Sequence, residues 1–195
     1  MKVVAVTTAQ IKELREKSGA GIMESKRALE ETEGNIERAI ELLRQQGVAK
    51  ASKKADRQAS QGLVEPYIHG GGRIGALVEV NCETDFVART PDFQNLAHDI
   101  AMQVAATAPR YVSGDAIPES DFAALESEFG SREDAITQTA LMDQIFIKDG
   151  KKTIRELVKE HIGKLGENIV VSRFSRFELG GSSNVAGTEA PQAEG

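Results

Sequence analysis

Apolar residues recur at helical spacing through the first fifty residues, and glycines interrupt them. Such spacing predicts amphipathic helices with one buried stripe. Thr7 precedes the first stripe as a capping residue, and the stripes are broken at Gly19–Gly21 and at Gly34. We expect the third helix to stop at Gly47. The pattern therefore predicts a compact three-helix domain over residues 1–50.

Residues 51–61 are small, polar and partly basic, and they lack an apolar stripe wide enough to bury. We expect them to form a helical linker. The pattern then changes, because residues 63–69 and 73–81 are rich in β-forming residues and Gly70–Gly72 lies between them. Glycine adopts positive φ without steric cost, so this arrangement predicts a β-hairpin.

A long apolar stripe follows Thr90–Pro91, where a capping residue precedes proline at the first helical position. We expect this helix to cover the sheet. Further helices are predicted over residues 133–146 and 153–165, and a final strand over residues 168–178. Residues 181–195 are rich in Gly, Ser and Ala and carry no stripe, which indicates a disordered tail.

The predicted fold class is α+β, in which the three-helix domain and the linker helix precede an antiparallel β-sheet core packed with helices over residues 62–180. The length of 195 residues, with 40% apolar and 28% charged residues, is typical of a globular protein. The apolar runs are far shorter than the roughly 20 residues that cross a bilayer, and the first residues lack a signal peptide's apolar region. We expect a cytoplasmic protein without membrane contacts.

Charge is distributed unevenly along the chain. Residues 1–60 carry 12 lysines and arginines against 9 acidic residues, whereas residues 113–149 carry 2 against 9. The net charge of −6 argues against direct binding of nucleic acid through its phosphates. The mildly basic N-terminal part still suits an acidic protein partner.

Side chains that carry catalysis or bind metals are scarce. The histidines His69, His98 and His161 do not fall into a metal-ligand spacing, which is typical of surface or boundary positions. Cys82 is either a nucleophile whose general base lies elsewhere or a small buried residue that closes a strand. Gly70–Gly72 does not open a helix as a phosphate-binding loop does. We expect no catalytic residue, cofactor or metal ion.

The segment NCETDFVART, residues 81–90, ends the hairpin in polar and acidic residues. Phe86 and Val87 follow without an apolar stripe around them. Periodicity leaves two positions open for Phe86: inward packing under the next helix, or projection as an apolar tip beside the carboxylate of Asp85. A projecting tip suits insertion into a pocket of another protein.

Residues 14–29 leave a similar alternative open. Ile22 and Met23 follow the first glycine corner. They are either interior residues of a small helical bundle or an exposed apolar patch, beside Lys12 and Arg15, that contacts a helix of a partner.

At these two segments the chain resembles the bacterial elongation factor Ts family, the guanine-nucleotide exchange factors for elongation factor Tu. LREKSGAGIMESKRALEETEGNIERAIELLRQQG is similar to the family's N-terminal ubiquitin-associated-like domain, VEVNCETDFVAR to its exchange signature, and GKLGENIVVSRF to its closing strand. Together with the basic linker, the resemblance covers residues 7–180. It implies a translation elongation factor that binds elongation factor Tu and promotes GDP release without catalytic chemistry.

The resemblance implies roles that periodicity does not supply. Thr84, Asp85, Phe86 and Val87 would lie beside the partner's magnesium and nucleotide site. Phe86 would insert between apolar side chains of the partner's GTP-binding domain, and the complex would persist until GTP enters. On this basis we expect exchange without a covalent step.

Lys12, Arg15, Ile22 and Met23 match positions at which the family's N-terminal domain touches a helix of that GTP-binding domain. The family often has methionine where this chain has Ile22, which keeps the apolar bulk and loses flexibility. Two other function classes remain open at this point: an adaptor in which the three-helix domain does the work while the core dimerises, and a hydrolase that uses Cys82.

Longer members of the family have two related halves in the core, and this chain resembles the short form. The resemblance implies a homodimer that supplies the missing half and gives a 2:2 complex with elongation factor Tu. The final strand carries Ile169 and Val171 on one face and Val170 and Phe174 on the other. It is either part of the dimer interface or buried within its own sheet.

Overall fold

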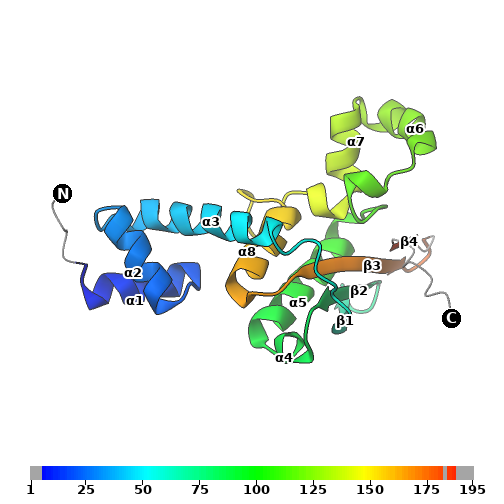
Figure 1. The fold of residues 1–195 in the computed structure, drawn as a ribbon. Helices are drawn as coiled ribbons and strands as arrows, with labels where there is room; N and C mark the ends of the chain where they lie inside the picture. Colours follow the sequence, from blue (N-terminus) through cyan, green and yellow to red (C-terminus); the bar gives the residue numbers. More distant parts are fainter. Residues whose placement is uncertain (1–5, 182–183, 188–195) are drawn as a thin grey trace.

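The computed structural model describes residues 6–181 and 184–187. Its N-terminal part is a unit of three helices, α1 (Thr8–Ser18), α2 (Ile22–Glu31) and α3 (Ile36–Ser52), as the apolar spacing predicts (Figure 1). The residues buried between these helices form a small separate core: Leu14, Ala28, Leu29 and Ala39.

Local capping determines where α1 begins and ends. The Thr7 hydroxyl accepts a hydrogen bond from the Gln10 backbone N–H at 3.3 Å, and the Gln10 side chain accepts one from the Thr7 N–H at 3.0 Å. Gly19 ends the helix at a φ of 68°, a conformation that glycine adopts without strain. Both boundaries therefore follow from the sequence alone.

The expectation that the third helix ends at Gly47 is wrong. Helix α3 runs through this glycine, and helical structure in the predicted linker over residues 51–61 is confined to the last residues of α3. Helix α8 (Ile154–Leu165) crosses α3 at this point: a Cβ added to Gly163 would lie 2.8 Å from the Cα of Gly47. Two glycines let the backbones approach closely, and packing against α8 offsets the low helix propensity of glycine.

The core contains an antiparallel sheet of four strands in the order β1-β2-β3-β4, namely β1 (Gln61–His69), β2 (Ile74–Cys82), β3 (Ile169–Glu178) and β4 (Asn184–Gly187). The first two strands form the predicted hairpin. Gly70–Gly72 turns the chain between them with φ values of 60°, 67° and 89°. The positions of β1 to β3 agree with the periodicity.

Strand β4 lies in the segment expected to be a disordered tail. It pairs with Arg173–Arg176 of β3, so the prediction for residues 181–195 is wrong at residues 184–187. The edge of β3 supplies backbone partners that composition does not reveal. Residues 182–183 and 188–195 of the expected tail lie outside the described residues.

A β-bulge changes the face of the sheet on which Phe174 lies. The register between β2 and β3 shifts by one residue at Ser172. Phe174 is therefore buried together with Ile169 and Val171, whereas the predicted alternation places it with Val170 on the opposite face. One face of β3 is therefore buried in the core, and the other face, which carries Val170 and Phe177, is exposed.

Helix α5 (Pro91–Thr107) covers one face of the sheet, as its Thr90–Pro91 start predicts (Figure 1). Its apolar stripe packs on the buried residues of β2, and α8 completes the same core. The opposite face of the sheet, here called the outer face, presents five exposed apolar side chains: Val64, Ile68, Leu77, Val170 and Phe177.

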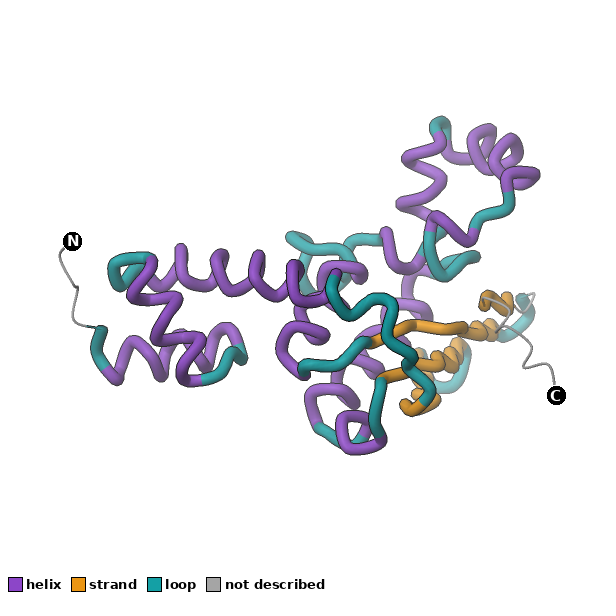
Figure 2. The backbone as a smooth tube through the Cα atoms, viewed as in Figure 1, coloured by secondary structure: helices purple, strands orange, loops and turns teal. Residues whose placement is uncertain are grey.

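Residues between α5 and α8 form a helical lobe that stands away from the sheet (Figure 2). It contains α6 (Glu119–Phe129) and α7 (Arg132–Thr139), with short 3-10 helices at Gly114–Ala116 and Leu141–Asp143. The lobe has its own small cluster of buried residues.

The helix predicted over residues 133–146 is too long. It ends at Thr139, because Ala140 takes an extended conformation and forms an isolated β-bridge with Tyr111. A tertiary contact thus ends this helix where the sequence carries no glycine or proline.

Candidate partner-binding site

The chain leaves β2 through α4 (Asp85–Ala88), a single helical turn on the core. Thr84 caps it, since its hydroxyl accepts a hydrogen bond from the Val87 N–H at 3.4 Å. Val87 packs against the core, whereas Phe86 projects and is 81% exposed. The inward position for Phe86 is therefore wrong. Residues 84–87 form a turn from which the apolar ring of Phe86 projects, called the tip below.

Asp85 flanks the exposed ring with a carboxylate that is already paired. Its Oδ2 lies 2.8 Å from a guanidinium nitrogen of Arg89, and both side chains remain open to solvent. Exposed pairs of this kind contribute little to stability. The Asp85 carboxylate can therefore exchange this partner for another cation at small cost.

The segment that precedes β3 holds the tip in place. Thr84 donates from its backbone N–H to Glu167 at 2.9 Å and from its hydroxyl to the same carboxylate at 2.6 Å. Asn168 donates its backbone N–H to Glu83 at 2.7 Å. Periodicity along the chain does not point to Glu167 or Asn168 as residues of this site. The signal that would find them is the pairing of β2 with β3, which brings the two strand ends together.

The second candidate surface lies on the three-helix unit. Ile22 and Met23 begin α2 and are 57% and 68% exposed, so the interior position is wrong for both. Lys12 and Arg15 are exposed on the adjoining helix α1. These four residues are called the docking corner below. Helices α1, α2 and α4 all lie on the lower side of the view in Figure 1.

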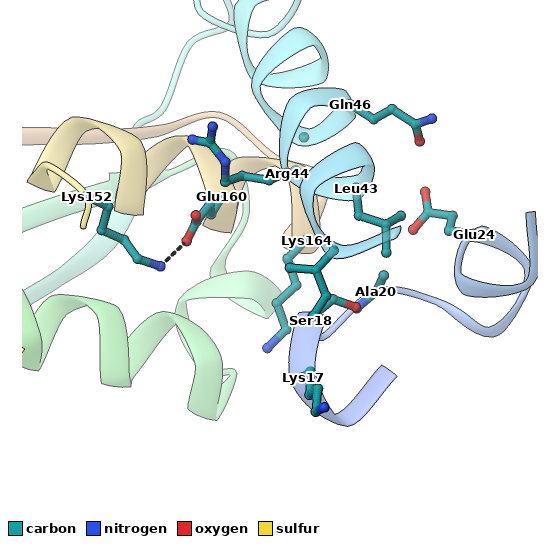
Figure 3. A pocket seen from close by; sticks show the side chains of 13 residues that line it. Lys17, Ser18, Ala20, Glu24, Leu43, Arg44, Gln46, Lys152, Glu160 and Lys164 are labelled. Carbon is teal, nitrogen blue, oxygen red and sulfur yellow. Dashed lines mark hydrogen bonds and ion pairs between the residues drawn. The ribbon is translucent and has the colours of Figure 1, made fainter. Parts of the chain in front are cut away.

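A cavity of about 190 Å³ lies where the three-helix unit meets α8 (Figure 3). Several basic side chains line it, but each is paired with an acid. Lys152 lies 2.7 Å from Glu160, and Lys164 lies 2.7 Å from Asp92. Paired cations leave little attraction for an anionic ligand, so the cavity is best described as part of the contact between the unit and the core.

Cys82 is fully buried at the end of β2, and its thiol donates a hydrogen bond to the Thr84 carbonyl at 3.1 Å. Burial raises the pKa of this thiol, and the nearby charge of Glu167 raises it further. A nucleophile needs the opposite shift and an accessible sulfur. The structure therefore agrees with the interpretation of Cys82 as a small residue that closes the strand.

His69 and His98 both lie against the ring of Tyr67, with centroid distances of 6.0 Å and 5.4 Å, whereas His161 lies on α8. His69 contacts the Tyr67 hydroxyl at 3.2 Å, and His98 lies 3.0 Å from Glu65. Burial lowers the pKa of His161 on α8. Within the described part of the chain, metal-ligating side chains do not gather into a group, and the helices there are too short or too polar to span a membrane.

Exposed apolar side chains held on two folded units are typical of proteins that recognise another protein. A family model described as elongation factor TS matches residues 2–134. The chain is 50% identical to the elongation factor Ts of Syntrophomonas wolfei, with 90% of this chain and 91% of the relative covered. It is 48% identical to that of Carboxydothermus hydrogenoformans, with 90% and 89% covered. The chain belongs to the elongation factor Ts family, which places it among the translation elongation factors.

Proposed function

We propose that this protein binds elongation factor Tu in its GDP form and accelerates GDP release, acting in the cytoplasm as an exchange factor without a covalent step. The tip inserts beside the magnesium and nucleotide site of the partner, and the complex persists until GTP enters. Family membership supports the partner and the activity. The observation that carries the proposal is the position of Phe86, a large apolar ring that is 81% exposed on a folded turn.

The exposed ring supplies the free energy that exchange requires. Burying a phenylalanine side chain on a partner contributes about 1.5–3 kcal/mol. A partner conformation that accepts the ring and holds magnesium and GDP poorly is then favoured by that amount. Coupling is reciprocal. The ratio by which this protein lowers the affinity of elongation factor Tu for GDP is therefore the ratio by which GDP lowers its affinity for this protein.

Asp85 has a secondary role in the proposal. A carboxylate near the acidic metal site of another protein must be solvated or paired to be tolerated. Its exposed pair with Arg89 brings a cation of this chain to that location together with the carboxylate. Asp85 can thus disturb the magnesium ligands while Arg89 limits the repulsion.

The docking corner supplies a second, separate contact. Ile22 and Met23 offer apolar surface, and Lys12 and Arg15 offer positive charge, which together suit the apolar and acidic face of a partner helix. In this proposal the corner contributes affinity, and the tip changes the nucleotide site.

Release of a fluorescent GDP analogue from purified elongation factor Tu tests the proposal. We expect Phe86→Ala to lower the maximal release rate by roughly 10- to 100-fold, in line with the burial free energy of the ring. Ile145→Ala is the matched control, because Ile145 is an apolar residue that is 55% exposed outside the tip and the docking corner. Equal acceleration by wild type and Phe86→Ala would remove the tip from the mechanism and favour the adaptor hypothesis.

We also propose that the chain acts as a homodimer in a 2:2 complex. The outer face of the sheet supports this, because Ile68, Leu77 and Phe177 form an exposed apolar surface across three neighbouring strands. Light scattering of the free protein and of its mixture with elongation factor Tu tests it. Leu77→Lys should give a monomer, and a monomeric wild type would refute the dimer.

A further inference from the structure

Where the backbone ladder between the end of β2 and the start of β3 stops, side-chain hydrogen bonds continue the connection. Cys82 and Ile169 form the last backbone pair of the two strands. Beyond this pair the Glu167 carboxylate accepts both polar hydrogens of Thr84, with one oxygen at 2.9 Å from the backbone nitrogen and the other at 2.6 Å from the hydroxyl. Thr84 is thus held through its backbone and its side chain at once.

The Thr84 hydroxyl has a second bond, which links Glu167 to the tip. Because the hydroxyl hydrogen points to Glu167, a lone pair of its oxygen remains to accept the Val87 N–H in the single turn of α4. Without the carboxylate the hydroxyl can rotate, and the partly buried Thr84 N–H loses its partner. A buried backbone donor without a partner costs free energy, so loss of the carboxylate favours other conformations of the turn.

Asn168 fixes the same point to the chain that leaves the three-helix unit. Its side chain is 3% exposed, and its amide nitrogen donates to the carbonyl oxygens of Arg57 at 2.7 Å and Ala55 at 3.2 Å. Arg57 also lies 3.5 Å from Glu83, which accepts the Asn168 backbone N–H at 2.7 Å. Three chain segments therefore meet beside the tip.

We infer that Glu167 is a positioning residue for nucleotide exchange: it holds Thr84 so that the tip presents Phe86 in the conformation that inserts into the partner. This inference rests on the proposed function, since it assigns how the inserted group is held. Glu167 does not touch the partner in this assignment. A tip that spends only part of its time in the competent conformation acts in proportion to that fraction.

Hydrogen exchange of the free protein tests the positioning without any partner. We expect Glu167→Ala to accelerate amide exchange at Thr84 and Val87 about tenfold, because two partly buried hydrogen bonds are lost. Glu167→Gln should stay near wild type, since the Gln side chain can accept from the Thr84 N–H and donate to its hydroxyl oxygen. Glu133→Ala, at an exposed position on α7, is the control.

GDP release from elongation factor Tu then measures the functional effect. We expect Glu167→Ala to lower the maximal rate about tenfold with an unchanged half-saturating concentration, because the docking corner still binds. Glu167→Gln should recover most of the rate. If Glu167→Gln is as slow as Glu167→Ala, the charge itself acts and the positioning role is overturned.

The two assays separate failure of this inference from failure of the proposed function. If the amides of Thr84 and Val87 exchange in Glu167→Ala at the same rate as in the wild type, the positioning role is overturned. The proposed acceleration of GDP release is not affected by that result. Accelerated amide exchange together with unchanged GDP release by Phe86→Ala would support the positioning of the tip and refute its proposed use. Thermal unfolding of each variant shows whether the core is intact.

Discussion

The tip and the docking corner look alike in the sequence but are built differently. Each places exposed apolar residues in the first turn of a helix, after a residue that can cap it. At the corner the cap is local, because Gly21 donates its N–H to Glu24 at 3.4 Å. At the tip Thr84 is held by Glu167, from the far end of the chain.

The tip and the docking corner also rest on different clusters of buried residues. The tip rests on the main cluster of buried residues, which joins the sheet to α5 and α8. The corner rests on a separate cluster of four buried residues in the three-helix unit. Few buried contacts mean low local stability. The docking corner can therefore open while the tip keeps its conformation. Four substitution experiments test this independence.

The largest effect is expected for Leu29→Ala in the core of the three-helix unit. Leu29 is fully buried, and truncation of such a leucine costs about 2–5 kcal/mol of unfolding free energy. Met23→Ala on the exposed corner should change it by less than about 0.5 kcal/mol. Denaturant unfolding followed by circular dichroism should show a separate early step for Leu29→Ala. A single shifted transition would instead show that the unit and the core unfold together.

A smaller effect is expected for Gly163→Ala, where α3 and α8 cross. The added Cβ would lie 2.8 Å from the Cα of Gly47, and overpacking costs about 1–3 kcal/mol. Gly150→Ala is the matched control, because a Cβ there meets no atom within 4 Å. Thermal unfolding measures the difference. If the two variants are equally stable, the crossing is not as close as the structure shows.

Cys82 provides a reporter beneath the tip. Its thiol is buried and bonded to the Thr84 carbonyl, so a thiol-specific reagent should modify it slowly in the wild type. We expect Glu167→Ala to raise the labelling rate about tenfold, because opening of the tip uncovers the sulfur. Leu29→Ala should leave the rate unchanged. Faster labelling in Leu29→Ala would mean that the corner and the tip are coupled.

The smallest effect concerns two serines in the three-helix unit. The Ser25 hydroxyl is buried without a hydrogen-bond partner in the described structure, so Ser25→Ala should be neutral or stabilising by up to about 1 kcal/mol. Ser18→Ala is the contrasting variant, because the Ser18 hydroxyl donates to the Leu14 carbonyl at 2.6 Å and its loss should destabilise by about 1 kcal/mol. Urea unfolding of both variants measures the difference, and destabilisation by Ser25→Ala would reveal a partner for its hydroxyl.

Most elements could be predicted because their signals are local. The capping box at Thr7, the glycines between β1 and β2, and the proline that opens α5 each act within a few residues. The errors fall where a distant contact overrides a local signal. Gly47 continues a helix because α8 packs against it, and Phe174 changes face because of a bulge.

Local patterns in the sequence are sufficient to predict the α+β class, the three-helix unit, the hairpin, and the two segments that carry the candidate site. These depend on spacing and capping, which act over short distances along the chain. Tertiary structure alone decided that Phe86, Ile22 and Met23 are exposed, because burial depends on which elements pack together. It also decided that Glu167 holds the tip, since hydrogen bonds between segments 83 residues apart exist only after β2 and β3 pair.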